Sequence, residues 1–147
     1  TYLSGARHSH LDSAGYAVDQ DLLRRGEAVA PAELARRLLA EEARRQVLSS
    51  LVVCFFARGL YDLPTAAACL GALGEDWDEA RLRSLGTEIL RRKHAFKVRE
   101  GFRLAMLPIP ERAMTTPAPA GAVDERYLRR ALAEMERWLE GNDGLEG

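Results

Sequence analysis

The spacing of apolar side chains limits this chain to a helical fold more strongly than any other feature of its sequence. No segment alternates between apolar and polar residues with the period of two that a half-buried strand shows. From Pro31 onward, apolar side chains instead return at helical intervals. The members of this row are Leu34, Leu38, Val47, Leu51 and Phe55. The sequence therefore predicts an all-α chain of about five helices with little or no sheet.

Glycine and proline mark the boundaries of the first predicted helices. Residues 1–15 are rich in glycine, serine and histidine, a composition that is typical of a loop. A short helix follows and ends at Gly26, and Pro31 is suited to the first turn of a long helix. We therefore divide the chain into a loop with a short helix over 1–30 and a helical C-terminal domain over 31–147.

Two more helices are predicted in the middle of the chain. Residues 65–74 favour a short helix that carries Cys69. Residues 75–96 favour a longer helix, in which Asp76 and Glu79 have the spacing of a capping box. The apolar residues expected to form its buried face are Leu82, Leu85, Ile89 and Phe96.

The last third of the chain combines a proline-rich segment with a strongly amphipathic one. Residues 106–122 contain too many prolines for a helix or a central strand, so we expect an extended connector. Asp124 is expected to cap the last helix, which should end at Gly141.

Charge and composition exclude several classes of function. The net charge is −1, with 21 basic and 22 acidic residues, so the chain carries no electrostatic signature of binding to nucleic acid or to a membrane surface. Its apolar runs are far shorter than the roughly 20 residues of a membrane span. Its two cysteines do not form a disulfide framework. We expect a cytoplasmic protein.

Cys54 lies in the longest apolar run, "LVVCFFA" over residues 51–57. A lone cysteine in an apolar helix is usually a small buried side chain, so the local pattern predicts an inert residue. No second cysteine or histidine lies near it at metal-ligand spacing, so this chain alone cannot complete a zinc or iron–sulfur site.

Histidines supply the other candidates for chemistry. His8 and His10 lie beside Asp12 in a glycine- and serine-rich segment, where they are suited either to acid–base or metal work or to ordinary surface hydrogen bonds. His94 lies in "RRKHAF" and is expected to be solvated on a charged helix face.

Several segments together resemble the C-terminal part of the aldehyde ferredoxin oxidoreductase family, the tungsten- or molybdenum-pterin enzymes. "SSLVVCFF" resembles a family segment in which an aspartate, two variable residues, glycine, leucine and cysteine precede aromatic residues. Other stretches are similar to family segments in the same order, so the resemblance covers nearly all 147 residues. These stretches are "ARHSHLDSAGYAVDQ", "FKVREGF", "LPIPERAMTTPAPAGA" and "VDERYLRRALAEMERW".

The resemblance implies a function for Cys54 as the fourth ligand of a 4Fe-4S cluster beside the pterin. The other three ligands of the family come from a Cys-x-x-Cys-x-x-x-Cys run farther upstream, which this chain lacks. The family's active-site histidine corresponds most nearly to His8, with His10 next to it. The parent enzyme is then expected to oxidise an aldehyde to a carboxylic acid and to pass electrons to ferredoxin, while the isolated chain is expected to be inactive.

The pterin-binding part of the motif is altered. The family's aspartate falls on Ser49, its glycine on Val52 and its leucine on Val53, so the pterin contacts are expected from Ser49 and Val53. A serine provides a hydrogen bond but no charge. Two alternatives stay open beside an aldehyde-oxidising enzyme: a related aromatic acyl-CoA reductase, and a helical scaffold or interaction domain without a site of its own.

Overall fold

The fold is known from a computed structural model that describes residues 14–57, 59–116 and 124–141. Within these ranges every regular element is helical and no strand occurs, which confirms the predicted all-α class. The elements are α1 (Ala14–Arg25), α2 (Pro31–Ser50), η2 (Phe55–Ala57), α3 (Leu63–Ala72), α4 (Glu79–Arg99), η3 (Leu104–Met106), α5 (Glu111–Thr115) and α6 (Glu125–Leu139).

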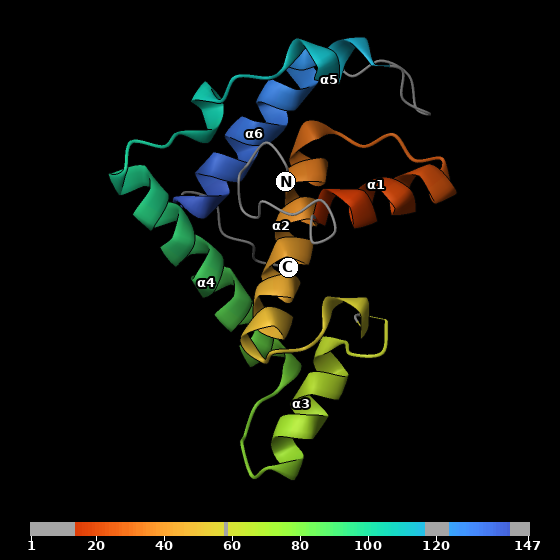
Figure 1. Ribbon diagram of the computed structural model, residues 1–147, viewed down its shortest axis with the longest axis vertical. Coiled ribbons are helices and arrows are strands. Elements are labelled where there is room, and N and C mark those ends of the chain that lie inside the picture. The colour runs from red at the N-terminus through yellow and green to blue at the C-terminus, as the bar shows by residue number, and fades with distance from the viewer. Residues whose placement is uncertain (1–13, 58, 117–123, 142–147) are drawn as a thin grey trace.

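Helix α2 is the central element, and α1, α4 and α6 pack against it (Figure 1). Their buried side chains form the main core, which holds Val18, Ala35, Leu38, Leu39, Ala43, Leu90, Leu104, Leu132, Met135 and Trp138. A separate small core joins the C-terminal end of α2 to α3 and α4, and it holds Val47, Leu63, Ala66 and Leu82. The N-terminal part of α2 is therefore enclosed by other helices, whereas its C-terminal end has α3 and α4 beside it.

The predicted end of α1, the predicted start of α2 and both predicted ends of α6 are confirmed, whereas α2 ends at Ser50 and does not reach Phe55. Helix α1 is followed by Gly26 with a φ of 62°, and Pro31 is the first residue of α2. The Asp124 side chain accepts a hydrogen bond from the amide of Arg126, and Gly141 follows α6 with a φ of 81°. Glycine at these left-handed positions carries no steric penalty, which is why it marks helix ends reliably.

The predicted start of α4 is wrong by two residues. Asp78, not Asp76, caps the helix, and its carboxylate accepts a hydrogen bond of 2.7 Å from the amide of Arg81. The carbonyl of Asp76 accepts instead from the Arg81 guanidinium, which also lies over the Trp77 ring at 4.2 Å from its centroid. These contacts place residues 75–77 in a turn before the helix, so the capping box centred on Asp76 does not form.

The buried face of α4 also differs from the predicted one. Phe96 is 57% exposed and lies beside the Arg99 guanidinium. The residues that are buried follow each other at intervals of four: Leu82, Gly86, Leu90 and His94. At Gly86 a Cβ atom would lie only 2.3 Å from the carbonyl oxygen of Ala43, so α4 crosses α2 at backbone contact. The closest approach of the two helices therefore selects a glycine, which a search for apolar residues passes over.

The connector predicted over 106–122 is only partly extended. Met106 ends η3, and α5 occupies Glu111–Thr115. The amides of Leu104 and Ala105 donate to the Glu136 carboxylate at 2.8 and 3.2 Å, so α6 caps η3. The prolines limit the length of helix in this segment but do not prevent a single turn.

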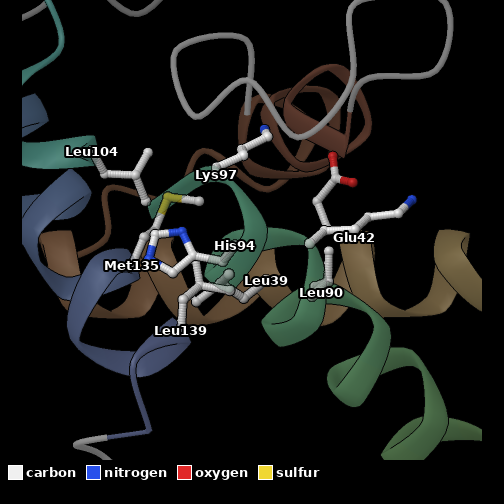
Figure 2. Close-up of a pocket in the computed structure, with 9 residues that line it drawn as sticks. Leu39, Glu42, Leu90, His94, Lys97, Leu104, Met135 and Leu139 are labelled. Atoms are coloured by element: carbon white, nitrogen blue, oxygen red, sulfur yellow. The ribbon is translucent and has the colours of Figure 1, made fainter. Parts of the chain in front are cut away.

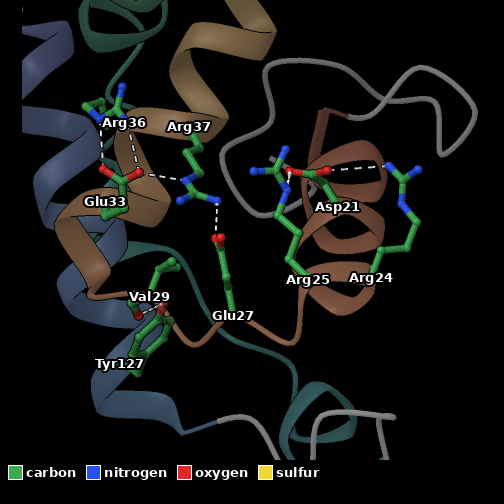
Figure 3. Close-up of polar contacts among 9 residues, drawn as sticks. All are labelled: Asp21, Arg24, Arg25, Glu27, Val29, Glu33, Arg36, Arg37 and Tyr127. Carbon is green, nitrogen blue, oxygen red and sulfur yellow. Dashed lines mark hydrogen bonds and ion pairs between the residues drawn. The ribbon is translucent and has the colours of Figure 1, made fainter.

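A set of polar contacts fixes the turn between α1 and α2 (Figure 3). Arg37 binds Glu27 of the turn at 2.8 Å and Glu33 of its own helix at 2.6 Å. The Tyr127 hydroxyl of α6 donates to the carbonyl of Val29 at 2.8 Å. The turn is thus attached both to α2 and to α6. None of the helices in the described ranges has the length and apolar character needed to cross a membrane.

Candidate functional site

The candidate site begins at the C-terminal end of α2, which closes with a left-handed cap. The amide of Val52 donates to the carbonyl of Ser49 at 3.1 Å, and the amide of Val53 donates to that of Leu48 at 3.0 Å. This pair of bonds is the Schellman motif, in which the residue before the last donor takes a positive φ. Val52 is that residue, with a φ of 58°.

Valine is an unfavourable residue at this position. A left-handed backbone brings the Cβ of an L-residue close to the next carbonyl, and a β-branched side chain is the worst case. Val52 is the one non-glycine residue with a positive φ in the part of the chain that the structure describes. The backbone therefore keeps the conformation that a glycine favours, although no glycine is present.

Cys54 follows this cap and lies outside α2, four residues beyond its last residue, Ser50. Its side chain is exposed and forms no disulfide. The prediction that Cys54 is a buried side chain of a helix is therefore wrong. The helical row predicted through Leu51 and Phe55 also stops early, because α2 ends at Ser50 and Leu51 is exposed.

Backbone hydrogen bonds hold the segment after Cys54 in a defined shape. The carbonyl of Cys54 accepts from the amide of Ala57 at 2.9 Å, and the carbonyl of Ala57 accepts from Leu60 and Tyr61 at 2.9 and 3.1 Å. Asp62 then caps α3 by accepting from the amide of Thr65 at 2.8 Å. The bond from Thr65 holds the pKa of the Asp62 carboxyl below its ordinary value. A charged carboxylate thus ends the segment at neutral pH.

This segment presents apolar side chains to the surface. We call it the Cys54 surface, defined by the exposed apolar side chains Leu51, Val52, Phe56, Leu60 and Tyr61 around the exposed cysteine. Val52, Phe56 and Leu60 are 90%, 76% and 77% exposed. A hollow of about 330 Å³ adjoins it at Leu51 and is lined largely by apolar residues of α2, α3 and α4. Large apolar side chains this exposed and this close together in the sequence indicate an interaction site.

The other predicted site residues have different positions. Ser49 is exposed in the last turn of α2, and Val53 is half-buried directly before Cys54, so both are neighbours of the cysteine in the cap. His8 and His10 lie outside the described residues. Cys69 lies on α3, as predicted, and its side chain is exposed.

His94 is the residue whose environment the sequence misrepresents most. It is only 5% exposed and lines a cavity of about 40 Å³ between α2, α4 and α6, together with Glu42, Lys97 and Met135 (Figure 2). Burial lowers the pKa of its imidazole, so the ring is neutral at physiological pH. The interval of four from Leu82 through Gly86 and Leu90 was the signal that places it on the buried face.

The cavity beside His94 is too small for a substrate. Pockets for small molecules usually have volumes of about 300–1,000 Å³, whereas this one has about 40 Å³. Glu42 at its edge is 1% exposed and accepts a hydrogen bond from the amide of Ala14 at 3.2 Å. The cavity therefore belongs to the packing of the helices, and the Cys54 surface is the better candidate for function.

The fold and the Cys54 surface together define a helical domain with a free cysteine and several large apolar side chains on its surface. A comparison with known protein families identifies the kind of domain: the family model described as aldehyde ferredoxin oxidoreductase, domains 2 & 3, matches residues 1–140. The chain belongs to this family. It is thus part of an oxidoreductase of the aldehyde ferredoxin oxidoreductase type. No match was found among curated proteins or among solved structures.

Proposed function

We propose that this chain contributes the C-terminal helical part of an enzyme that oxidises an aldehyde to a carboxylic acid and transfers the electrons to ferredoxin. Cys54 is the fourth ligand of a 4Fe-4S cluster in that enzyme. The observation that carries the proposal is the exposed thiol, directly after a left-handed helix cap and within an apolar surface, in a chain of this family. When bound, a tungsten- or molybdenum-pterin supplies the two-electron chemistry and the cluster supplies one-electron transfer.

The Cys54 environment suits a cluster ligand in one respect and is incomplete in another. An exposed thiol is available to a metal as a thiolate, and thiolates are the usual ligands of 4Fe-4S clusters. Four such ligands are needed, and the chain has two cysteines. The remaining ligands therefore come from an upstream part of the enzyme, in the same or a separate chain. The Cys54 surface is the face that this upstream part covers.

The pterin contact is the altered part of the site. Ser49, where the family has an aspartate, offers a hydroxyl in the last turn of α2, and Val53 offers backbone groups beside Cys54. Val52 has the left-handed backbone that a glycine favours, but it adds a Cβ and two methyl groups at an almost fully exposed position. Ser49 would offer the pterin a neutral hydrogen bond, and the Val52 side chain would hinder a close approach to the backbone at position 52.

The protons of the reaction are assigned to the histidines near the start of the chain. Oxidation of an aldehyde takes oxygen from water and releases two protons and two electrons. His8, or His10 beside it, accepts a proton near the substrate, because an imidazole changes charge near neutral pH. The electrons leave singly to ferredoxin.

The two exposed cysteines provide a matched experiment. Cys54→Ser and Cys69→Ser remove the same chemical group from exposed sites, and neither substitution disturbs a core. In the protein that contains this chain together with the upstream part, Cys54→Ser should lose the cluster, because a hydroxyl is a much poorer iron ligand than a thiolate. Cys69→Ser should retain full iron. Iron per protein and the melting temperature are measured for both variants.

Full iron occupancy in Cys54→Ser would remove the ligand assignment and favour a helical scaffold without a site of its own. The isolated chain provides a second check. It should show neither the absorbance of a 4Fe-4S cluster nor aldehyde oxidation after reconstitution with iron and sulfide, because it holds too few cysteines for a cluster.

A further inference from the structure

Three potential metal ligands from two helices meet at one end of the helical bundle. They are His94 of α4, Glu136 of α6 and Glu140, the residue that follows α6 as its C-cap. One ring nitrogen of the histidine and one oxygen of each carboxylate all lie within 4.8 Å of one another. Glu136 and Glu140 are one helical turn apart, so both carboxylates reach the same side of α6.

We propose that His94, Glu136 and Glu140 form a binding site for a divalent transition-metal ion of the zinc type. Helical bundles build metal sites in this way, from side chains that face each other across two helices. Zinc takes imidazole nitrogen and carboxylate oxygen ligands, and with three protein ligands it completes its tetrahedron with water. The site is separate from the Cys54 surface, since it uses α4, α6 and neither cysteine.

The state of the His94 ring is an independent observation that points to a missing ligand. The side chain is 95% buried, because its exposed fraction is 5%. Its Nε2 atom is buried and has no hydrogen-bond partner among the residues that the structure describes. A buried polar atom without a hydrogen-bond partner destabilises a fold. A metal ion bound to the imidazole gives the ring a partner and so removes this cost.

Glu136 is already oriented for a ligand. Its two oxygens accept the amides of Leu104 and Ala105 at 2.8 and 3.2 Å. A carboxylate oxygen has a second lone pair, so each oxygen can accept an amide and still bind a metal. Hydrogen bonds of this kind hold a ligand in place and are a regular part of protein metal sites.

The ligands need a small adjustment to bind zinc. Tetrahedral ligands at 2.0–2.2 Å from zinc lie about 3.3–3.6 Å apart, whereas the three ligand atoms of this cluster lie within 4.8 Å of one another, so they must move closer together to bind the ion. Glu140 makes the adjustment, because it is exposed and lies at the end of its helix. Glu136 and His94 are held by the surrounding chain and move less.

The charges around the cluster favour a transition metal over magnesium or calcium. The two carboxylates carry negative charge, while Lys97 and Arg103 lie near His94 and oppose a cation. Magnesium or calcium, bound through oxygen atoms alone, would therefore bind weakly at this site. A metal that forms a strong bond to imidazole nitrogen gains enough to overcome the positive neighbours.

The metal would fasten α6 to α4 and to η3. The Arg91 guanidinium of α4 already lies 4.9 Å from the centre of the Trp138 ring of α6, and a bond to the Trp138 carbonyl supports it. A metal at His94, Glu136 and Glu140 adds a second link between these helices. Binding should therefore raise the melting temperature of the chain.

The test uses the untagged chain with Cys54→Ser and Cys69→Ser as its background, so that neither thiol binds zinc. Zn²⁺ is titrated by calorimetry and by thermal shift, and Mg²⁺ serves as the comparison ion. We expect one Zn²⁺ per chain and a higher melting temperature, with no response to Mg²⁺. Glu140→Gln should weaken Zn²⁺ binding by about tenfold or more and leave the metal-free melting temperature unchanged, since its side chain is exposed.

Two further variants complete the test. His94→Gln should abolish Zn²⁺ binding, because a neutral amide is a poor ligand for zinc. Glu134→Gln removes the same charge from the same helix, but Glu134 pairs with Arg137 and is not in the cluster, so it should bind Zn²⁺ like the background. Absence of Zn²⁺ binding, or equal affinity in Glu140→Gln and Glu134→Gln, would overturn the proposal.

Discussion

The two ends of α2 differ in what covers them. Around its N-terminal part, α1, α4 and α6 bury side chains such as Leu39, which is 3% exposed. Beyond its C-terminal end, the same chain leaves Leu60 77% exposed within the Cys54 surface. The first region holds together through contacts within the chain. The second region has a defined backbone, but no residue that the structure describes covers its apolar side chains, which is typical of an interface and not of a core.

The same comparison separates stability from function. Burial in the main core stabilises the fold directly through the hydrophobic effect. The Cys54 surface contributes little to the folding of the chain, because its apolar side chains are exposed. Substitutions in the two regions should therefore change the free energy of unfolding by different amounts in the isolated chain and by similar amounts in the assembled enzyme.

The largest difference is expected between Leu132→Ala and Leu60→Ala. Leu132 is 4% exposed in the main core, and loss of its side chain leaves a cavity. The free energy of unfolding of the isolated chain should fall by about 2–5 kcal/mol. Leu60→Ala should leave it within about 0.5 kcal/mol. Urea unfolding followed by circular dichroism measures both.

The comparison would fail if Leu60→Ala destabilised the isolated chain as strongly as Leu132→Ala. In the assembled enzyme, the proposed cover of the Cys54 surface predicts that Leu60→Ala weakens association with the upstream part. Measurements on the isolated chain and on the assembled enzyme together distinguish a side chain of the interface from one of the core.

The next effect is expected at the crossing of α2 and α4. Gly86→Ala places a Cβ 2.3 Å from the carbonyl oxygen of Ala43, and backbone atoms cannot move aside as a flexible side chain can. The helices must separate, which should destabilise the isolated chain by about 1–3 kcal/mol, although alanine has the higher helix propensity. Gly71→Ala in α3 is the control, because nothing lies within 4 Å of its Cβ position. A stabilising Gly86→Ala would contradict the close crossing.

Local chemistry explains the parts of the fold that the sequence predicts well. Pro31, Gly26, Asp124 and Gly141 act through their own backbone or side chain, and each marks a helix end correctly. The sequence does not decide between two nearby residues that are equally suited to cap a helix. Asp76 and Asp78 are both suitable caps, and the contact of Arg81 with the preceding turn decides between them.

Burial is predicted less well, because it depends on what lies beside a residue. The apolar run after Val47 resembles a core segment, yet Val52 and Phe56 are exposed among the residues that the structure describes. His94 resembles a solvated residue, yet it continues the buried row through Gly86. Cys54 is a candidate through its resemblance to a family motif, whereas the cluster of His94 with two glutamates becomes visible only when α4 and α6 are packed together.

A smaller effect, of opposite sign, is expected at the cap of α2. Val52→Gly relieves the left-handed backbone of a β-branched residue and should stabilise the isolated chain by about 1 kcal/mol. Val53→Gly, one residue farther on, has no such strain to relieve and should destabilise the chain. Thermal unfolding compares the two. If both variants were destabilised, the left-handed cap would not describe the chain in solution.

The smallest effect concerns the ion pairs that surround the start of α2 (Figure 3). Glu33 accepts hydrogen bonds from Arg36 at 2.8 Å and from Arg37 at 2.6 Å. The hydrogen bond from Arg36 is the larger cause and that from Arg37 the second, and together they lower the pKa of the Glu33 carboxyl to about 2. Because the pKa of unfolded glutamate is about 4.3, the charged Glu33 stabilises the fold above that pH. This contribution is lost as the pH falls toward 2.

Glu33→Gln removes this contribution and should flatten the acid side of the stability profile. The side chain is 31% exposed, so solvent and salt screen the pairs, and the loss at neutral pH should stay below about 1 kcal/mol. Glu125→Gln is the control, because Glu125 pairs with Arg129 alone and is 47% exposed. The free energy of unfolding is measured from pH 7 to pH 3 at low and high salt. If Glu33→Gln and Glu125→Gln gave the same profile, the two arginines would not act together on Glu33, and the turn between α1 and α2 would depend on the Tyr127 hydrogen bond to Val29 instead.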